Sequence, residues 1–220
     1  MDELAKSIQE KYIEDLTSKY PLHRFLTLFM VIFFMLNYEV GSVNIYAILS
    51  KTSIKDIFDF QDGILARLTI IQLLLAMMIV YFLNVSYKKI NNSSFIKLTS
   101  LYDFSNYTTK VIKKYKNIRR NDAYDFFIVK EIDKKIETKK MELRAKAITC
   151  ELCMSLLICV LWSLNFSTTN LVAISSLTTA FVILQWRMYK FYIIQFFPLY
   201  VARNHLLNEE ISFEKGYNEQ

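Results

Sequence analysis

The sequence predicts an all-α integral membrane protein with four transmembrane helices in two hairpins and a cytoplasmic helical hairpin between the second and third spans. Its hydrophobic residues, 53% of the chain, are gathered into four blocks. Three Gly and two Pro in 220 residues are too few for the turns of a loop-rich β fold. A soluble domain of this length has no core that could absorb all four blocks.

The four apolar blocks are the predicted transmembrane helices. They are Phe25–Ser50, Leu68–Tyr87, Ala147–Phe166 and Thr168–Trp186. The first contains one charge, Glu39, and the third is interrupted only by Glu151. Each block is close to the ~20 residues that an α-helix needs to cross the hydrocarbon of a bilayer. We therefore predict a first transmembrane hairpin at residues 25–87 and a second at residues 147–186.

Orientation follows from the distribution of Lys and Arg, because basic residues beside a span are retained in the cytoplasm. The segment Lys88–Lys146 holds 16 basic residues against 7 acidic ones, a balance of +9, whereas Asn165–Asn170 carries no charge. We expect a multi-pass protein of the inner membrane with this segment and both termini in the cytoplasm.

Residues 88–146 form the predicted basic cytoplasmic insert. They contain neither Gly nor Pro, and their apolar residues recur at helical spacing. One series is Phe104, Tyr107, Val111, Tyr115 and Ile118, and the other is Val129, Ile132, Ile136 and Leu143. We expect two helices, the second of which continues into the third span because nothing between Lys139 and Thr149 would stop it.

The two ends of the chain are predicted to lie at the cytoplasmic face. Residues 1–24 carry Leu4, Ile8, Tyr12 and Leu16 at a spacing of four, which indicates an amphipathic helix ending near Pro21. Residues 187–220 begin with an aromatic stretch that contains two cations. Such a stretch favours the membrane interface up to Pro198, and a polar tail follows.

Glu39 is the most unusual residue of the first block, because an ionised carboxylate within hydrocarbon costs at least ~2.5 kcal/mol. Asn37 and Asn44 stand near it. One interpretation is an intramembrane polar ring of Asn37, Glu39 and Asn44 that lines an aqueous path in a homo-oligomer. The other is that the span ends early and places Glu39 at the outer interface.

The basic insert supplies the second set of candidate residues. They are Lys113, Lys114, Lys116, Arg119, Arg120, Lys134, Lys135, Lys139 and Lys140. These cations could contact a partner protein or a second copy of the chain, bind anionic lipids of the inner leaflet, or bind nucleic acid. A solvated face that merely fixes topology is the fourth interpretation. We favour protein contacts first and lipid second, and we do not expect direct binding of nucleic acid.

Two short motifs each match only part of a known catalytic or metal-binding signature. Asp59-Phe-Gln-Asp62-Gly63 with Ala66-Arg67 resembles the first half of the signature of CDP-alcohol phosphotransferases, which are membrane enzymes. The glycine and two aspartates that complete that signature are replaced by Ala76, Val80 and Asn84. Cys150 and Cys153 form a C-x-x-C without the further ligands that structural zinc requires. We therefore expect no catalytic residues, no metal and no cofactor, and hence no enzyme.

The order and lengths of these segments, the basic insert included, resemble the four-span membrane subunit of bacterial anti-phage defence systems of the Kiwa type. This architecture-level resemblance implies a homo-oligomeric sensor or scaffold that works with a cytoplasmic effector protein. The alternative function is an oligomeric ion channel or pore-forming effector with Glu39 near the conduction path. A phosphotransferase-like enzyme is a distant third.

Overall fold

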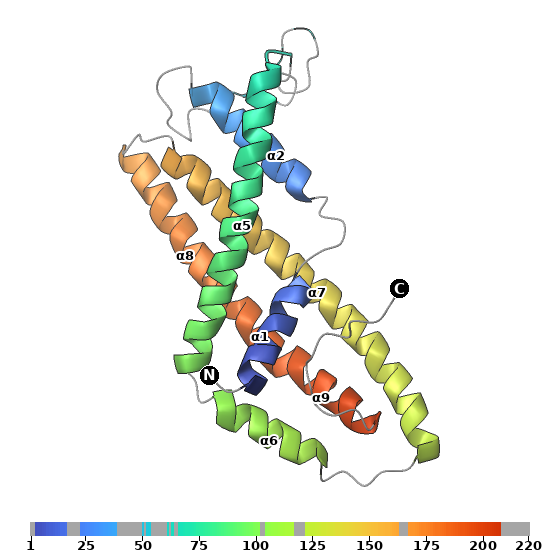
Figure 1. The fold of residues 1–220 in the computed structure, drawn as a ribbon. Coiled ribbons are helices and arrows are strands. Elements are labelled where there is room, and N and C mark those ends of the chain that lie inside the picture. Colours follow the sequence, from blue (N-terminus) through green and yellow to red (C-terminus); the bar gives the residue numbers. More distant parts are fainter. Residues whose placement is uncertain are drawn as a thin grey trace. The chain divides into compact units, whose positions relative to one another are not determined.

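A computed structural model describes residues 3–16, 23–38, 50, 52–53, 61, 63, 66–101, 104–116, 122–162 and 167–207. All regular secondary structure in these ranges is helical (Figure 1), which confirms the all-α prediction. The helices are α1 (Glu3–Leu16), α2 (His23–Tyr38), α5 (Ile70–Leu101), α6 (Phe104–Lys116), α7 (Asp122–Trp162), α8 (Thr168–Phe191), a π-helical segment η1 (Tyr192–Phe196) and α9 (Phe197–Leu206).

The chain divides into two compact units. Unit 1 comprises residues 1–19, 88–147 and 185–220, and unit 2 comprises residues 20–87 and 148–184. The helices α5, α7 and α8 contribute residues to both units. Each of these helices changes composition where it passes from one unit to the other, since Lys88, Lys146 and Arg187 lie in unit 1 beside apolar stretches in unit 2.

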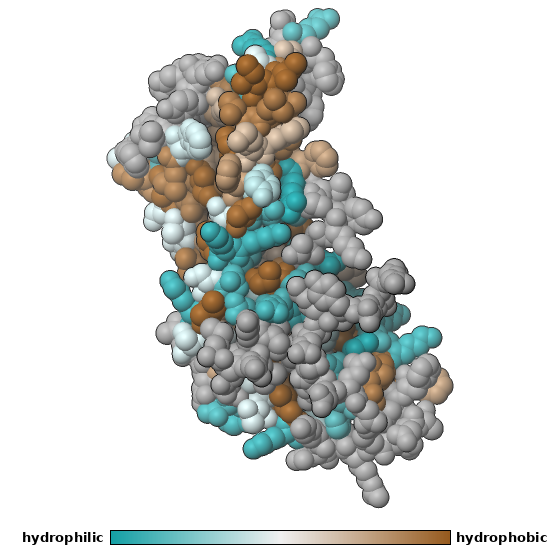
Figure 2. Space-filling view, in the orientation of Figure 1, coloured by the Kyte–Doolittle hydropathy of each residue, from teal (hydrophilic) through white to brown (hydrophobic). Residues whose placement is uncertain are grey.

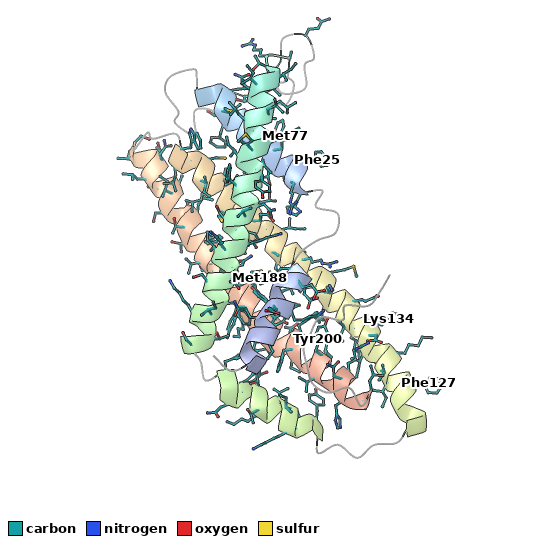
Figure 3. All side chains as sticks on the ribbon, in the orientation of Figure 1. Phe25, Met77, Phe127, Lys134, Met188 and Tyr200 are labelled. Atoms are coloured by element: carbon teal, nitrogen blue, oxygen red, sulfur yellow. The ribbon has the colours of Figure 1, made fainter. Side chains whose placement is uncertain are left out.

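Unit 2 is the apolar unit. Its interior contains Val31 and Ile32 of α2, Ala76 and Leu83 of α5, and Cys159 of α7. Hydrophobic residues also cover its outer surface where α2 and the first half of α5 face the viewer (Figure 2). Phe25 and Met77 project outward from these two helices, and Phe25 is 71% exposed (Figure 3). An outer surface of this kind favours contact with lipid over contact with water.

Within the described ranges, three helical stretches are long and apolar enough to cross a membrane, namely Ile70–Ser100, Phe127–Trp162 and Thr168–Leu206. The helix α2 has 16 residues, about 24 Å at 1.5 Å per residue, which is shorter than the ~30 Å of hydrocarbon. Residues 39–49 of the first predicted span lie outside the described ranges. A fourth span therefore remains a prediction.

Unit 1 is built around a core of aromatic side chains. The ring of Tyr12 in α1 stacks on Phe95 of α5 with centroids 4.7 Å apart, and it meets the edge of Tyr192 at 4.8 Å. Ile8 and Tyr12 are buried, as the spacing of α1 predicts. The α7 residues Val129, Ile136 and Leu143 are also buried. Burying one such large side chain contributes about 1.5–3 kcal/mol.

The helices α5 and α7 are both longer than single spans. As the sequence predicts, α7 runs without a break from the basic insert into the apolar stretch. The helix α5 continues 14 residues past Tyr87, through Asn-Asn-Ser-Ser, which the sequence did not lead us to expect. Contacts made in unit 1 offset the low helix propensity of these residues. Asn91, for example, is buried and accepts a hydrogen bond from Gln185 of α8.

The aromatic stretch after Trp186 differs from the interfacial segment that its sequence suggests. Tyr192, Phe196 and Phe197 are fully buried in the core of unit 1, and the helix continues through η1 into α9. Pro198 has no backbone N–H, so a carbonyl in the preceding turn lacks its helical partner. The hydroxyl of Tyr107 in α6 donates to the Ile193 carbonyl at 3.4 Å. Packing against α6 thus supports the π-helical segment η1, which the spacing of apolar residues in the sequence does not reveal.

Candidate functional site

A polar layer lies within the apolar unit 2 at the start of α2. The Nε2 atom of His23 is 2.9 Å from Oε2 of Glu151 in α7, and each side chain is only 10% exposed. Thr27 and Ser155, one turn further along their helices, are buried and donate their hydroxyls to the carbonyls of His23 and Glu151. Every polar group named here therefore has a partner, as buried polar groups require.

Arg24 extends this layer to a third helix. Its Nη2 donates to Oδ1 of Asn84 in α5 at 3.1 Å. Its Nε is buried and has no hydrogen-bond partner among the described residues. The first turn of α2 is thus attached to α7 through His23 and to α5 through Arg24. In a chain whose helices enter a bilayer, an ionisable pair of this kind marks a candidate functional site.

The sequence located only part of this layer. The sequence shows Glu151 as a charge that interrupts the third apolar block, and the structure gives its partner as His23. No sequence motif points to His23 as that partner. Asn84 occupies a position where the phosphotransferase signature has an aspartate, yet here it binds Arg24. Glu39 and Asn44 lie outside the described residues, and the side chain of Asn37 is likewise not described.

A second buried ion pair lies in unit 1. The ammonium group of Lys140 on α7 is 2.7 Å from Oδ1 of Asp15 on α1, whose side chain is fully buried. One turn further along α7, Arg144 donates to the backbone carbonyl of Asp15 at 3.3 Å. Oδ2 of Asp15 has no hydrogen-bond partner among the described residues. These contacts attach α1 to α7.

Burial raises the pKa of the Asp15 carboxyl, while the hydrogen bond and charge of Lys140 oppose that shift. Lys11 also lowers this pKa and Glu14 raises it. The direction shows that the cost of removing the carboxylate from water exceeds the gain from the nearby cations. A folded-state pKa above the ordinary value makes the contribution of Asp15 to stability greatest at low pH.

The candidate cations of the insert separate into two groups. Lys139 and Lys140 are engaged inside unit 1: Lys139 pairs with Glu142 at 3.0 Å, and Lys140 pairs with Asp15. Lys113, Lys114, Lys134 and Lys135 are exposed, and Lys135 also pairs with Glu131 on the surface at 2.7 Å. Figure 3 shows Lys134 projecting from α7 on the same helix as Phe127, which is 70% exposed. The side chain of Lys116 and residues Arg119 and Arg120 are not described.

The outer face of α6 is strongly cationic. This helix contains four lysines and no acidic residue, and Lys110, Lys113 and Lys114 are exposed. Its opposite face carries Phe104 and Thr108, both buried. Over the described residues of unit 1, the exposed side chains include 11 Lys or Arg and 4 Glu. The surface of unit 1 therefore suits an anionic partner.

The two sequence motifs do not form a site in the described part of the chain. Asp59 and Asp62 lie outside it. Cys150, Cys153 and Cys159 lie on α7 and form no disulfide in the described part of the chain, and Cys153 lies 3.6 Å from the carbonyl of Leu177 on α8. A helix-facing thiol of this kind behaves as a small apolar residue.

Comparison with known proteins leaves the polar layer and the cationic surface as the main guides to function. No family model, no curated protein and no solved structure matches the chain.

Proposed function

We propose that the chain is a homo-oligomeric sensor or scaffold of the bacterial inner membrane, in anti-phage defence, whose basic cytoplasmic helices recruit an effector protein. Four spans anchor it, with both termini and unit 1 in the cytoplasm. The observation that carries the proposal is the exposed cationic surface of unit 1, formed by Lys110, Lys113 and Lys114 on α6 and by Lys130, Lys134 and Lys135 on α7. We name these six residues the distal basic surface.

Distance supports a protein partner over the adjacent bilayer for this surface. The helix α5 extends 13 residues from Lys88 to Leu101, about 20 Å along its axis, before α6 begins. Lys134 and Ala147 are also 13 residues apart on α7. If these helices are tilted by 40° from the membrane normal, the distance from the membrane surface measured along the normal is still about 15 Å. The Debye length is ~8 Å at physiological salt. At this distance the electrostatic potential of the lipid headgroups therefore falls to about a sixth, or less, of its value at the membrane surface.

The exposed apolar surface of unit 2 supports the membrane location, and one helix offers a surface for self-association. Ser175 and Thr179 are exposed on α8, four residues apart and therefore on the same side of the helix. Val172 and Val182 extend the same face and are exposed as well. Small side chains at this spacing allow membrane helices to approach closely.

The test is co-purification from cells that carry the native neighbouring genes. The tagged wild-type chain is expected to retain a soluble partner in detergent, and Lys113→Glu/Lys114→Glu is expected to release it. Lys134→Glu on α7 should weaken the complex further. The complex of the wild type should also dissociate at high salt, because exposed charges are screened.

A matched control separates loss of the surface from loss of the fold. Lys97→Glu reverses the charge at an exposed position of α5 outside the distal basic surface and ten residues beyond the apolar stretch. This variant should keep the partner. If Lys113→Glu/Lys114→Glu keeps it as well, or if the wild type retains none, recruitment through the distal basic surface is wrong.

A further inference from the structure

Two lysines of α7 converge on one aromatic ring of α8. The ammonium groups of Lys139 and Lys146 lie 5.3 Å and 4.9 Å from the centroid of the Phe191 ring. The lysines are seven residues apart, two turns of α7, and Leu143 between them is fully buried. Both ammonium groups therefore reach the same ring, which is only 8% exposed.

Among the described residues, the positive charges around this ring are only partly balanced by acidic groups. Glu142 pairs with Lys139 at 3.0 Å, which offsets one of the two ammonium charges. Arg187 and Lys190, in the turn of α8 before Phe191, are both exposed and add two cations to the same stretch of that helix. Like charges gathered in this way repel each other. An anion bound beside them would be attracted to each cation and would offset this repulsion.

The position along α7 identifies the kind of anion. Lys146 immediately precedes Ala147, where α7 enters its apolar stretch, and Arg187 follows the apolar stretch of α8. Lysines at such a position extend their ammonium groups to the headgroup level of a bilayer. The α7 lysines of the distal basic surface, Lys130, Lys134 and Lys135, lie 11 to 16 residues before Lys146, about 17–24 Å along the helix axis.

We infer that Lys139 and Lys146, with Phe191 between them, bind the phosphodiester headgroup of an anionic phospholipid of the inner leaflet. The two ammonium groups donate hydrogen bonds to the phosphate oxygens, and the largely buried Phe191 ring positions the two lysine side chains. Glu142 limits the affinity by competing for Lys139. This inference rests on the inner-membrane topology proposed above and is independent of effector recruitment.

Native mass spectrometry of the delipidated protein in detergent tests this site. Phosphatidylglycerol and phosphatidylcholine of equal chain length are titrated separately, with inorganic phosphate as a third arm. The wild type is expected to bind phosphatidylglycerol about tenfold more tightly than phosphatidylcholine. Lys139→Gln/Lys146→Gln should remove most of this preference, since each juxtamembrane lysine contributes a several-fold gain in affinity.

Three further variants make the result specific. Lys97→Gln removes an exposed lysine of α5 that lies ten residues beyond Tyr87, and it should leave the preference unchanged. Lys146→Arg keeps the charge and should retain binding. Glu142→Gln releases Lys139 and should increase the affinity for phosphatidylglycerol, a gain that loss of packing would not produce. Circular dichroism checks that each variant keeps its helices.

The inference is overturned by equal binding of the two lipids, by an unchanged preference in Lys139→Gln/Lys146→Gln, or by a weaker affinity in Glu142→Gln. Inorganic phosphate that displaces phosphatidylglycerol at similar concentration would show a site for free phosphate and overturn the lipid assignment. None of these results involves the distal basic surface. Failure of this site is therefore distinguishable from failure of effector recruitment.

Discussion

His23 Nε2 lies 2.9 Å from Glu151 Oε2, although the two residues are 128 positions apart in the sequence. The pair is largely buried in unit 2, the apolar unit. The pair links α2 to α7, and the neighbouring residue Arg24 links α2 to α5 through Asn84. The polar layer thus adds to the apolar packing of Val31 and Ile32 in holding α2 within unit 2.

Loss of one partner of this pair should destabilise the protein. Glu151→Leu leaves His23 buried without its acceptor, and we expect a loss of about 1–3 kcal/mol. Glu151→Gln keeps a hydrogen-bonding group in place and should cost less. The measurement is thermal unfolding in detergent for both variants, for His23→Leu, and for His23→Leu/Glu151→Leu. A coupling energy near zero in this double-mutant cycle would contradict a direct interaction.

The Asp15 carboxyl should make stability depend on pH in a defined direction. Its folded-state pKa is raised above the ordinary 3.8. Its contribution is therefore complete below about 3.8 and is lost as pH rises through the folded-state pKa. Asp15→Asn cannot ionise, so the wild type should lose stability relative to this variant between pH 4 and neutrality. Unfolding temperatures of both proteins across that range check the sign, and a difference that does not vary with pH would contradict it.

Two lysines only six residues apart on α7 should respond very differently to the same substitution. Lys140 is 27% exposed and pairs with the fully buried Asp15, so Lys140→Met leaves a buried carboxylate without its cation. We expect a loss of about 3 kcal/mol at neutral pH. Lys134 is exposed, and Lys134→Met should change stability by no more than about 0.5 kcal/mol. Chemical or thermal unfolding of the two variants side by side tests the contrast.

The small exposed residues of α8 should determine the oligomeric state. Leucine at both positions, in Ser175→Leu/Thr179→Leu, prevents close approach of a second helix and should shift the detergent-solubilised protein toward the monomer. Light scattering coupled to size-exclusion chromatography measures the mass. Ser86→Leu makes the same kind of change at an exposed position of α5 and should leave the mass unchanged. A wild type that is already monomeric would contradict self-association.

Local patterns in the sequence predict the helices well. The spacing of Val129, Ile136 and Leu143 identifies the buried face of α7, and the absence of a helix-stopping residue before Thr149 predicts its continuity. Composition identifies the apolar stretches of α5 and α8. These features depend on neighbours within a few turns, and the sequence displays such neighbours directly.

The pairs that hold the helices together could not be assigned in the same way. Glu151 interrupts an apolar run and requires a partner, but nothing local distinguishes His23 from other polar residues. Asp15 gives a clearer signal that was missed. It follows Ile8 and Tyr12 at positions i+7 and i+3, which places it on the buried face of α1. A carboxylate on that face requires a cation from another helix.

The unbroken course of α7 limits how the chain can change in length. Lys140 and Glu151 are eleven residues apart, which is close to three full turns, so the two positions face nearly the same side of the helix. One residue inserted between them would rotate one position against the other by about 100°. An insertion of seven or eleven residues would nearly restore the angular register of the two positions on the helix.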